Sequence, residues 1–400
     1  MTSRPAPPRL APLVEPGPDL SRAELERWAR HVLLPDLGPV GQRRLRAARV
    51  AVVGTGGLGC PVLQYLVAAG VGHVTLYDDD LVETSNLQRQ VLHGTDDVGR
   101  PKVDSALDAL RRMGGATTLA GVRERLEPGN AAALLAGHDL VVDGTDNFPT
   151  RYTLDAACRE LGVPHVWAAL MATRAQVSTF WAAPRTLGDA AVAGVTLRDL
   201  FPSPPDPTTV PACGDAGIVG ALCGVVGSTM ALEVVKLVTG TGEPLLGRVL
   251  FVDAATMRTH EIPVAGGGAA DEATGAADQP GPDRAREWPL VSPKVLADRL
   301  AGDAPPLVVD VRAVGELAFG QVPGALHLAL SDLADDPVPA VERLRAAGAG
   351  ERPVVLVCKG GVRARAAARH LAEHGVEELA VLDGGMIAWS REVDPDLPRY

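Results

Sequence analysis

The chain has 400 residues, 46% of them hydrophobic and 22% charged, so it holds enough apolar material for two or three folded domains and is not a wholly disordered or fibrous protein. Its formal net charge of −11 argues against general nucleic-acid binding, because no overall positive charge attracts phosphate backbones. The five cysteines are scattered and form no CxxC pair, which argues against a disulfide framework.

The N-terminal residues show no export signal. The first nineteen residues contain six prolines and no apolar core, so we expect residues 1–18 to be disordered. The longest notable uncharged stretch, 216–232, has 17 residues, fewer than the ~20 that a membrane span needs. We therefore expect a cytoplasmic protein that contacts no membrane, with the stretch forming a buried helix.

Apolar runs of strand length alternate with helical patterns over residues 19–264. A helix is expected over 19–30, where Ser21 and Glu24 have the spacing of a capping box. Strands are expected over 49–54, 73–78, 117–124, 139–143, 163–170, 176–181 and 247–264. Helices are expected over 58–69, 102–113, 130–136 and from 216 onward. This alternation predicts an α/β Rossmann-like domain with a mostly parallel sheet covered on both faces.

A change in composition separates a second domain. Residues 265–283 contain no aromatic or branched aliphatic side chain. They cannot bury enough apolar surface to offset the conformational entropy that ordering would cost. We expect a flexible linker over 265–287, whose 19-residue core would span roughly 22–26 Å. The C-terminal domain, 288–400, is expected to be a smaller α/β unit with strands over 306–310 and 353–358 and a helix over 363–374.

The sequence GTGGLG (54–59) follows the first expected strand and opens a helix. Its glycines, Gly57 among them, allow a tight turn whose amides can approach a phosphate at the positive end of the helix dipole. Asp78 ends the next strand, where a carboxylate can bind a ribose hydroxyl. These features fit NAD and ATP equally well.

Charged residues farther along the chain favour ATP. A triphosphate needs Arg or Lys and usually a divalent cation, because its charge is concentrated at one end. Arg89 in SNLQRQ (85–90) and Lys102 can supply the positive charge, and Asp146 can help to hold Mg²⁺. The alternative is that Arg89 and Lys102 are ordinary surface charges.

Five motifs carry a family resemblance: RWARHVLL (27–34), GTGGLGC (54–60), SNLQRQ (85–90), VGRPKV (98–103) and DGTDN (143–147). With them, the chain resembles the ubiquitin-activating-enzyme-like adenylyltransferases of the MoeB and ThiF family, which charge sulfur-carrier proteins. The resemblance implies ATP binding by Gly57, Asp78, Ser85, Asn86, Leu87, Gln88, Arg89, Lys102, Asp146 and Asn147. It also implies a homodimer in which Arg30 reaches into the partner's ATP site.

The chain departs from many relatives in one respect. Those relatives bind a structural zinc through two CxxC pairs, and neither pair exists here. Tetrahedral zinc needs four nitrogen or sulfur ligands at defined spacing, so we predict no zinc.

Cys358 ends an expected strand in CKGGVR (358–363), just before a helix. Such a loop can turn its amides toward one sulfur and stabilise a thiolate or persulfide anion. The C-terminal domain resembles the rhodanese sulfurtransferases, a resemblance supported by DVR (310–312), VPGALH (322–327) and DGG (383–385). It has Ala364 where many members have a hydroxyl residue.

Cys213 lies in VPACGDAG (210–217), before the long apolar helix. Its family counterpart has been assigned either to acylation by the carrier or to resolution of a disulfide, and the sequence leaves both open, together with a passive loop cysteine. Cys60, Cys158 and Cys223 are expected to be packing residues.

Together these features resemble the two-domain MoeZ type of enzyme. The resemblance implies adenylation of the C-terminal glycine of a ubiquitin-like carrier of the MoaD, ThiS or CysO type, which ends in Gly-Gly, followed by sulfur transfer to give a thiocarboxylate. The expected catalytic residues are Cys358, Cys213, Arg30, Arg89, Lys102 and Asp146. The sulfur donor would be a cysteine desulfurase or thiosulfate. The alternatives are an NAD-dependent oxidoreductase and a carrier-binding scaffold without chemistry.

Overall fold

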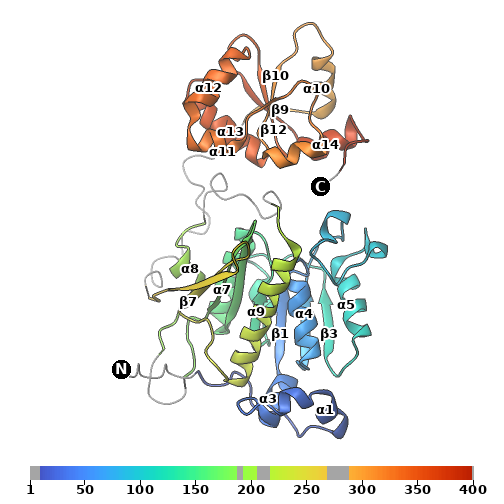
Figure 1. Cartoon of the computed structure of the whole chain (residues 1–400), viewed down its shortest axis with the longest axis vertical. Helices are drawn as coiled ribbons and strands as arrows, with labels where there is room; N and C mark the ends of the chain where they lie inside the picture. Colours follow the sequence, from blue (N-terminus) through green and yellow to red (C-terminus); the bar gives the residue numbers. More distant parts are fainter. Residues whose placement is uncertain (1–9, 187–191, 205–216, 268–287, 399–400) are drawn as a thin grey trace. The chain divides into compact units, whose positions relative to one another are not determined.

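A computed structural model describes residues 10–186, 192–204, 217–267 and 288–398, which divide into two compact units (Figure 1). The first unit contains the described residues up to 267, and the second contains those from 288 onward. The predicted linker, 265–287, lies almost wholly outside the described residues.

An eight-stranded sheet forms the centre of the first unit, in the order β3-β2-β1-β4-β5-β6-β7-β8. The strands are β1 (Arg49–Val53), β2 (His73–Tyr77), β3 (Thr118–Val122), β4 (Leu140–Asp143), β5 (His165–Met171), β6 (Arg174–Phe180), β7 (Arg248–Asp253) and β8 (Arg258–Pro263). The first five pair in parallel, and the pairs β5–β6, β6–β7 and β7–β8 are antiparallel. The predicted Rossmann-like core is therefore confirmed, with an antiparallel extension.

Helices cover both faces of this sheet (Figure 1). The described helices of this unit are α1 (Arg22–Arg27), α2 (Ala29–Val32), α3 (Gly38–Ala47), α4 (Gly59–Ala68), α5 (Lys102–Arg112), α6 (Ala131–Leu135), α7 (Phe148–Leu161), α8 (Leu197–Leu200) and α9 (Gly220–Thr239). Alternate residues of β1 show the two layers: Val50 and Val52 pack with α4, α5 and α9, whereas Ala51 and Val53 pack with α6 and α7. A strand buried on both faces explains why its sequence is continuously apolar.

The strand register brings three chain reversals to one edge of the sheet. Val53 pairs with Tyr77 of β2 on one side and with Asp143 of β4 on the other. The residues that follow these strands, Gly54, Asp78 and Gly144, therefore lie together at the carboxyl edge, where open α/β sheets bind their ligands.

The N-terminal region differs from its prediction. Disorder was expected over residues 1–18, but Leu10 and Val14 are buried in the main core, and the Leu13 amide donates to the Leu237 carbonyl at 3.1 Å. Prolines exclude a regular helix there, but extended backbone can still dock on a surface. Residues 1–9 lie outside the described residues.

The helix expected over 19–30 is divided in two, since α1 ends at Arg27 and α2 begins at Ala29. The capping box of Ser21 and Glu24 is present as predicted. Among the described helices, α9 alone is long and apolar enough to cross a membrane by length and composition. It is 56% buried in its most apolar window and packs against α4 and the sheet, as a core helix does. Its predicted start at 216 is four residues too early.

The second unit has a five-stranded parallel sheet in the order β11-β10-β12-β13-β9. Its strands are β9 (Leu290–Val291), β10 (Leu307–Asp310), β11 (Leu326–His327), β12 (Val354–Val357) and β13 (Leu379–Leu382). Its helices are α10 (Pro293–Leu300), α11 (Leu330–Asp335), α12 (Pro337–Ala346), α13 (Val362–Glu373) and α14 (Gly385–Glu392). Helices α11–α13 cover one face, and α10 and α14 cover the other. This confirms the predicted second α/β unit and places Cys358 directly after β12.

Candidate nucleotide and sulfur-transfer sites

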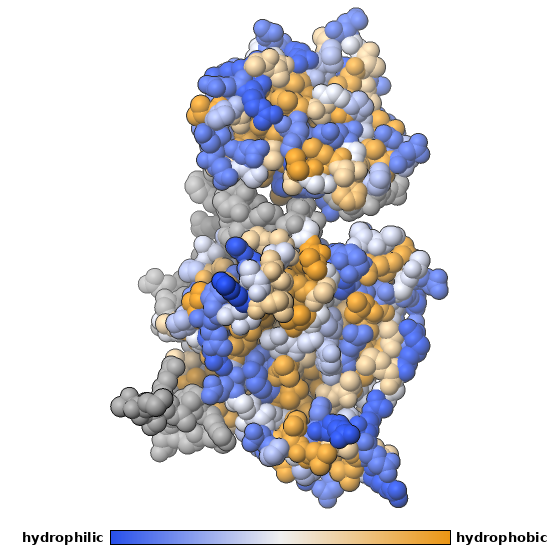
Figure 2. All heavy atoms as spheres, viewed as in Figure 1, coloured by the Kyte–Doolittle hydropathy of each residue, from blue (hydrophilic) through white to orange (hydrophobic). Residues whose placement is uncertain are grey.

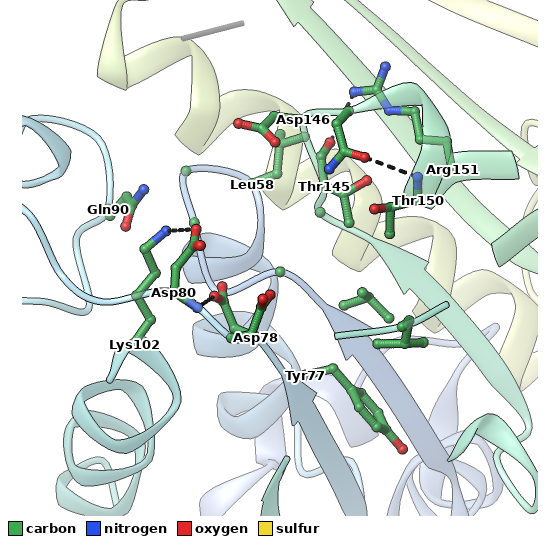
Figure 3. A pocket seen from close by; sticks show the side chains of 18 of the residues that line it. Leu58, Tyr77, Asp78, Asp80, Gln90, Lys102, Thr145, Asp146, Thr150 and Arg151 are labelled. Atoms are coloured by element: carbon green, nitrogen blue, oxygen red, sulfur yellow. Dashed lines mark hydrogen bonds and ion pairs between the residues drawn. The ribbon is translucent and has the colours of Figure 1, made fainter. Parts of the chain in front are cut away.

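A pocket of about 380 Å³ opens at the carboxyl edge of the large sheet (Figure 3). Its volume falls within the usual range of small-molecule sites. The residues lining it include six of those predicted to bind ATP: Gly57, Asp78, Arg89, Lys102, Asp146 and Asn147. They come from the turns after β1, β2 and β4, from the segment that follows the 3₁₀ helix Thr84–Asn86 and from the start of α5, so the fold brings together residues far apart in sequence.

Two glycine-bearing turns touch at the floor of this site. Gly54 has φ +89°, and a Cβ there would lie 2.8 Å from the Gly144 carbonyl oxygen. A Cβ on Gly59 would lie 1.9 Å from the Gly54 oxygen. The sequence therefore needs glycine at 54 for its backbone angle and at 59 for the close approach of helix and strand. Gly56, Gly57 and Leu58, which lead into the N-terminus of α4, line the pocket, where a phosphate-binding turn would lie.

Asp78 fastens the glycine turn to the end of β2. Its Oδ2 accepts hydrogen bonds from the Thr55 amide at 2.7 Å and from the Thr55 hydroxyl at 2.9 Å, and its Oδ1 accepts one from the Asp80 amide at 2.9 Å. The carboxylate still lines the pocket. Asp78 thus shapes the turn and also presents an acceptor suited to a ribose hydroxyl.

The two predicted cations, Lys102 and Arg89, are among the cationic residues that line the pocket. The Lys102 ammonium lies 2.7 Å from Asp80 Oδ2, and Lys102 as a whole is 7% exposed. Arg89 donates from Nη1 to the Ser85 carbonyl at 3.0 Å, which fixes its direction. Both are held by contacts within the site, which disfavours the alternative that they are free surface charges.

Several predicted residues take other positions. Ser85, Asn86, Leu87 and Gln88 are not among the described residues that line the pocket. Asn86 instead accepts from the Glu83 amide at 3.2 Å and shapes the short 3₁₀ helix (Thr84–Asn86) that precedes Arg89. Arg30 is exposed on α2 and does not line this pocket. Cys213 lies outside the described residues.

Asn147 caps α7, because its Oδ1 accepts from the Thr150 amide at 3.0 Å. Behind it lies a buried acid, Asp143, which accepts from the Thr145 amide at 2.9 Å and lies 3.2 Å from His165 Nε2. Burial raises the pKa of Asp143, but hydrogen bonding and the charge of His165 outweigh it, so the pKa lies below its usual value. The loop that carries Asp146 is therefore anchored on a buried carboxylate.

Arg151 is a pocket residue that the sequence did not reveal. It is 3% exposed, donates to the Thr145 carbonyl at 3.0 Å, and stacks over Phe148 and Trp167 at 5.2 and 5.7 Å from the ring centres. Its position four residues after Asn147, on the first turn of α7, is the signal that could have identified it. Sequence alone does not show which side of that helix faces the site.

His93 supports the glycine turn from behind. Its Nε2 lies 3.1 Å from the Thr55 carbonyl and its Nδ1 lies 2.8 Å from the Ser105 hydroxyl. Burial lowers the pKa of His93, and the hydrogen bond to Thr55 offsets only part of this effect. The neutral ring can therefore hold the glycine turn without adding charge to the pocket.

The candidate sulfur site of the second unit surrounds Cys358. Its Sγ is 3.0 Å from the Gly361 amide and 3.4 Å from the Ala364 amide, and both amides donate to it. Gly361 has φ +99°, a backbone angle that glycine adopts readily. At Ala364 the contact comes from the backbone, so the missing hydroxyl does not remove it. Donated hydrogen bonds of this kind stabilise an anionic sulfur.

Two ion pairs brace this loop. Arg312 is fully buried and binds Asp310 through Nε and Nη2, with Nη2 at 2.7 Å from Oδ2. Arg363, inside the cysteine loop, pairs with Glu316, with Nη1 at 2.6 Å from Oε2. The DVR and CKGGVR motifs are therefore joined through Glu316, which the sequence did not identify.

The remaining described cysteines are all buried, as expected of packing residues. Cys60 donates to the Thr55 carbonyl at 3.3 Å, and burial raises its pKa to about 12. Cys223 also lines the nucleotide pocket, beside Gly57, so its description as a packing residue alone was incomplete.

Comparison with known proteins agrees with this geometry. The ThiF family model matches residues 28–269, and a rhodanese-like domain model matches residues 292–392. A probable adenylyltransferase/sulfurtransferase MoeZ of Mycobacterium tuberculosis is 39% identical over 98% of this chain and 99% of that protein. The adenylyltransferase and sulfurtransferase MOCS3 of Bos taurus is 36% identical over 99% of this chain and 90% of its own length.

Two further similarities cover the first unit. The SAMP-activating enzyme E1 of Haloferax volcanii is 44% identical over 61% of this chain and 87% of its own length. The crystal structure of E. coli MccB covers 61% of this chain and 71% of its own, with a TM-score of 0.51 and 20% identity, a likeness of fold alone. The resemblance inferred from the motifs is confirmed: the chain belongs to the ThiF family and carries a rhodanese-like domain after it.

Proposed function

We propose that the first unit uses ATP to adenylate the C-terminal carboxylate of a ubiquitin-like carrier protein and that the second unit delivers sulfur to it. The observation that carries the proposal is the pocket, which combines a glycine turn, Asp78, two cations and Asp146. It occurs in a chain whose full-length relatives are named adenylyltransferase/sulfurtransferases, and one shorter relative is named SAMP-activating enzyme E1.

The residues fit a magnesium nucleotide. Arg89 and Lys102 supply positive charge for phosphates, and the amides of the glycine turn lie at the same edge. Carboxylate oxygen is the ligand that Mg²⁺ prefers, so Asp146 would hold the ion. Bound there, Mg²⁺ supplies neutralisation of phosphate charge.

In the first step the carrier carboxylate attacks the α-phosphorus of ATP. A bond forms between the carboxylate oxygen and phosphorus, the bond to the leaving phosphate breaks, and the products are an acyl-adenylate and pyrophosphate. The nucleophile is already ionised at neutral pH, so no protein base is needed. Lys102 and Arg89 stabilise the charge that develops on the departing phosphates.

In the second step a persulfide on Cys358 attacks the acyl carbon. The terminal sulfur forms the new bond, AMP leaves, and the carrier is joined to Cys358 through an acyl disulfide. The two amides that point at Cys358 Sγ support an anionic sulfur before the attack. The persulfide would be loaded by a cysteine desulfurase or from thiosulfate.

Release of the product requires a second thiol. We assign this role to Cys213 from the sequence: its thiolate attacks the Cys358 sulfur, the carrier thiocarboxylate leaves, and a disulfide between the two cysteines remains for a dithiol reductant. Residues 19–264 and 288–400 would act as separate domains, with residues 265–287 as the linker that lets them meet.

We also propose a homodimer in which Arg30 serves the partner's nucleotide site. Arg30 is exposed and lies outside the pocket of its own chain. Beside it, Leu33 and Leu34 are 70% and 51% exposed. Neighbouring exposed apolar side chains, unlike ones scattered singly, can mark an interaction surface. Figure 2 shows apolar atoms next to strongly hydrophilic ones at the end of the first unit where Figure 1 places α1 and α3.

The protein would work in the cytoplasm without zinc.

The test is ATP–pyrophosphate exchange with small carriers that end in Gly-Gly, followed by mass spectrometry of the carrier. Wild-type protein should exchange pyrophosphate only when the carrier is present. Lys102→Ala should reduce exchange by about 10²-fold or more, because a charge at the reacting phosphates is lost. Binding of NAD in place of ATP would refute the proposal.

A second variant separates the two half-reactions. Cys358→Ala should keep pyrophosphate exchange but form no thiocarboxylate, which mass spectrometry detects as the exchange of one carrier oxygen for sulfur. Cys158→Ala is the matched control, because this buried cysteine lies outside the nucleotide pocket and is not part of the Cys358 loop. If Cys358→Ala still transfers sulfur, the persulfide assignment is wrong.

A further inference from the structure

Lys102 is held at the nucleotide pocket by a short two-stranded ladder. Residues 80–82, which continue from β2, run antiparallel to residues 99–102, which lead into α5. The ladder consists of the Leu81–Pro101 bridge and of hydrogen bonds from the Val82 amide to Arg100 at 2.9 Å, from the Gly99 amide to Val82 at 2.8 Å and from the Lys102 amide to Asp80 at 2.9 Å. The backbones of Asp80 and Lys102 are therefore hydrogen-bonded to each other, independently of their side chains.

The side chains of these two residues form an ion pair at the end of the ladder. Lys102 Nζ lies 2.7 Å from Asp80 Oδ2, and both residues line the pocket (Figure 3). The Lys102 side chain is 9% exposed, whereas that of Asp80 is 67% exposed. The lysine stem is thus buried and its ammonium is drawn toward an acid at the pocket wall.

This pairing matters because a lysine side chain is flexible. Its four-carbon stem loses rotamer freedom when it is fixed, and a phosphate must otherwise supply that ordering. We infer that Asp80 is a positioning residue of the nucleotide site, which orders the Lys102 ammonium for the phosphates while it stays bound to the lysine. This inference rests on the proposed function and concerns a residue outside the ATP-binding motifs.

The neighbouring acids suggest a competing explanation. Carboxylate oxygens of Asp78, Asp79 and Asp80 lie within 4.8 Å of one another, as in a cation site. However, Asp78 is occupied by Thr55 and by the Asp80 amide, and Asp80 is occupied by Lys102. The ion pair therefore accounts for Asp80 without a metal. The two explanations also predict different responses to mutation.

The sign of the effect makes the inference testable. Asp80 is negative, so simple electrostatics predicts that its removal should tighten the binding of a polyphosphate. If Asp80 acts by ordering Lys102, its removal should weaken binding, and this loss should depend on Lys102. Nucleoside monophosphate lacks the phosphates that Lys102 would meet, so its binding should respond less.

The experiment is calorimetric titration of the full chain with MgATP and with AMP. Asp80→Asn should weaken MgATP binding by about three- to tenfold, within the range of coupled charged pairs, and AMP binding by less than about twofold. Asp80→Glu should restore much of the loss. The variant with Asp80→Asn and Lys102→Met together should bind MgATP no more weakly than Lys102→Met alone.

Two controls accompany the series. Asp79→Asn removes the same charge from the same wall but leaves the pair of Asp80 and Lys102 intact, so it should tighten MgATP binding. Asp108→Asn breaks the ion pair between Asp108 and Arg100, a residue of the same ladder. Neither residue lines the pocket, so this variant should bind MgATP with wild-type affinity.

Three results would overturn the inference. They are tighter MgATP binding by Asp80→Asn, full additivity of the Asp80 and Lys102 substitutions, and an equal loss of affinity in Asp80→Asn, Asp79→Asn and Asp108→Asn. Wild-type protein that binds no MgATP would refute the proposed function itself.

Discussion

Arg312 supports the candidate sulfur site through the segment that carries Glu316. Its guanidinium is fully buried and makes three hydrogen bonds to Asp310, and it also donates to the Gly320 carbonyl at 2.6 Å. A buried charge is tolerated in this way only when its partner and its donors are all satisfied. The residue therefore fixes the segment that carries Glu316 against the cysteine loop.

Arg312→Ala should lower the free energy of unfolding of the second unit by about 3–5 kcal/mol, because it leaves the Asp310 charge buried without its partner. Urea denaturation of the full chain measures this change. Arg391→Ala, at an exposed position on α14, is the matched control and should change the free energy by less than about 0.5 kcal/mol. An equal effect of the two substitutions would contradict the assignment.

A second residue-scale prediction concerns pH. Burial lowers the pKa of His93 below its usual 6.5, so below that pH the unfolded chain binds a proton that the native chain does not. The free energy of unfolding should therefore fall as the pH drops below about 6.5, by at most about 1.4 kcal/mol per pH unit, until the native pKa is reached. Burial acts on His73 and His138 in the same direction.

His93→Gln should make this decline shallower in urea denaturation between about pH 5 and 8. The variant lacks the titrating ring and so loses one proton-linked contribution. A slope identical to that of the wild type would show that His93 does not contribute to it.

The sequence could identify residues whose chemistry follows from a local pattern. Asp78 and Lys102 lie in recognisable motifs, and the structure places both at the pocket. Glu316 could not be found in this way, because its partner Arg363 comes from the cysteine loop. Arg151 has a local signal in its spacing from Asn147, but its stacking on Trp167 of β5 depends on the fold.

At the scale of elements, the start of α14 holds the cysteine loop in place. The Met386 amide donates to the Cys358 carbonyl at 2.9 Å, and the Ile387 amide donates to the Lys359 carbonyl at 3.1 Å. Gly385 has φ +59°, and a Cβ there would lie 2.3 Å from the Cys358 carbonyl oxygen. The DGG motif thus permits the close approach of helix and loop.

Gly385→Ala should reduce sulfur transfer by about tenfold or more, since a displacement of about 1 Å near reacting atoms is costly, and should leave pyrophosphate exchange unchanged. The control is Gly315→Ala, because a Cβ on Gly315 meets nothing within 4 Å. Thiocarboxylate formation, measured by mass spectrometry, would contradict the prediction if the two variants were equally active.

Elements with a strong apolar run were predictable, and those that depend on tertiary contacts were not. Strand β1 appears over Arg49–Val53, as its continuous Val-rich sequence indicated. Helix α3 was missed because its face is only partly apolar, with Gly41, Gln42 and Leu45 buried. Strand β9 has two residues and exists only through its pairing with β13.

At the scale of the whole molecule, the two units have separate cores, so they should respond separately to ligands. In calorimetry of the full chain, MgATP at about one hundred times its dissociation constant should stabilise the first unit by about 2.7 kcal/mol. The transition of the second unit should not move, while Arg312→Ala should move that transition alone. A single transition that shifts in both cases would show that the units unfold together.

The close approach of Gly54 to the Gly144 carbonyl limits the substitutions that this protein can accept during evolution. A side chain added at position 54 would have room only if the loop after β4 moved away, and that loop also carries Asp146. The clash is with backbone, so no substitution at 144 relieves it, and the positive φ of Gly54 disfavours any side chain as well. Position 54 is therefore expected to stay glycine in any lineage that still binds the nucleotide.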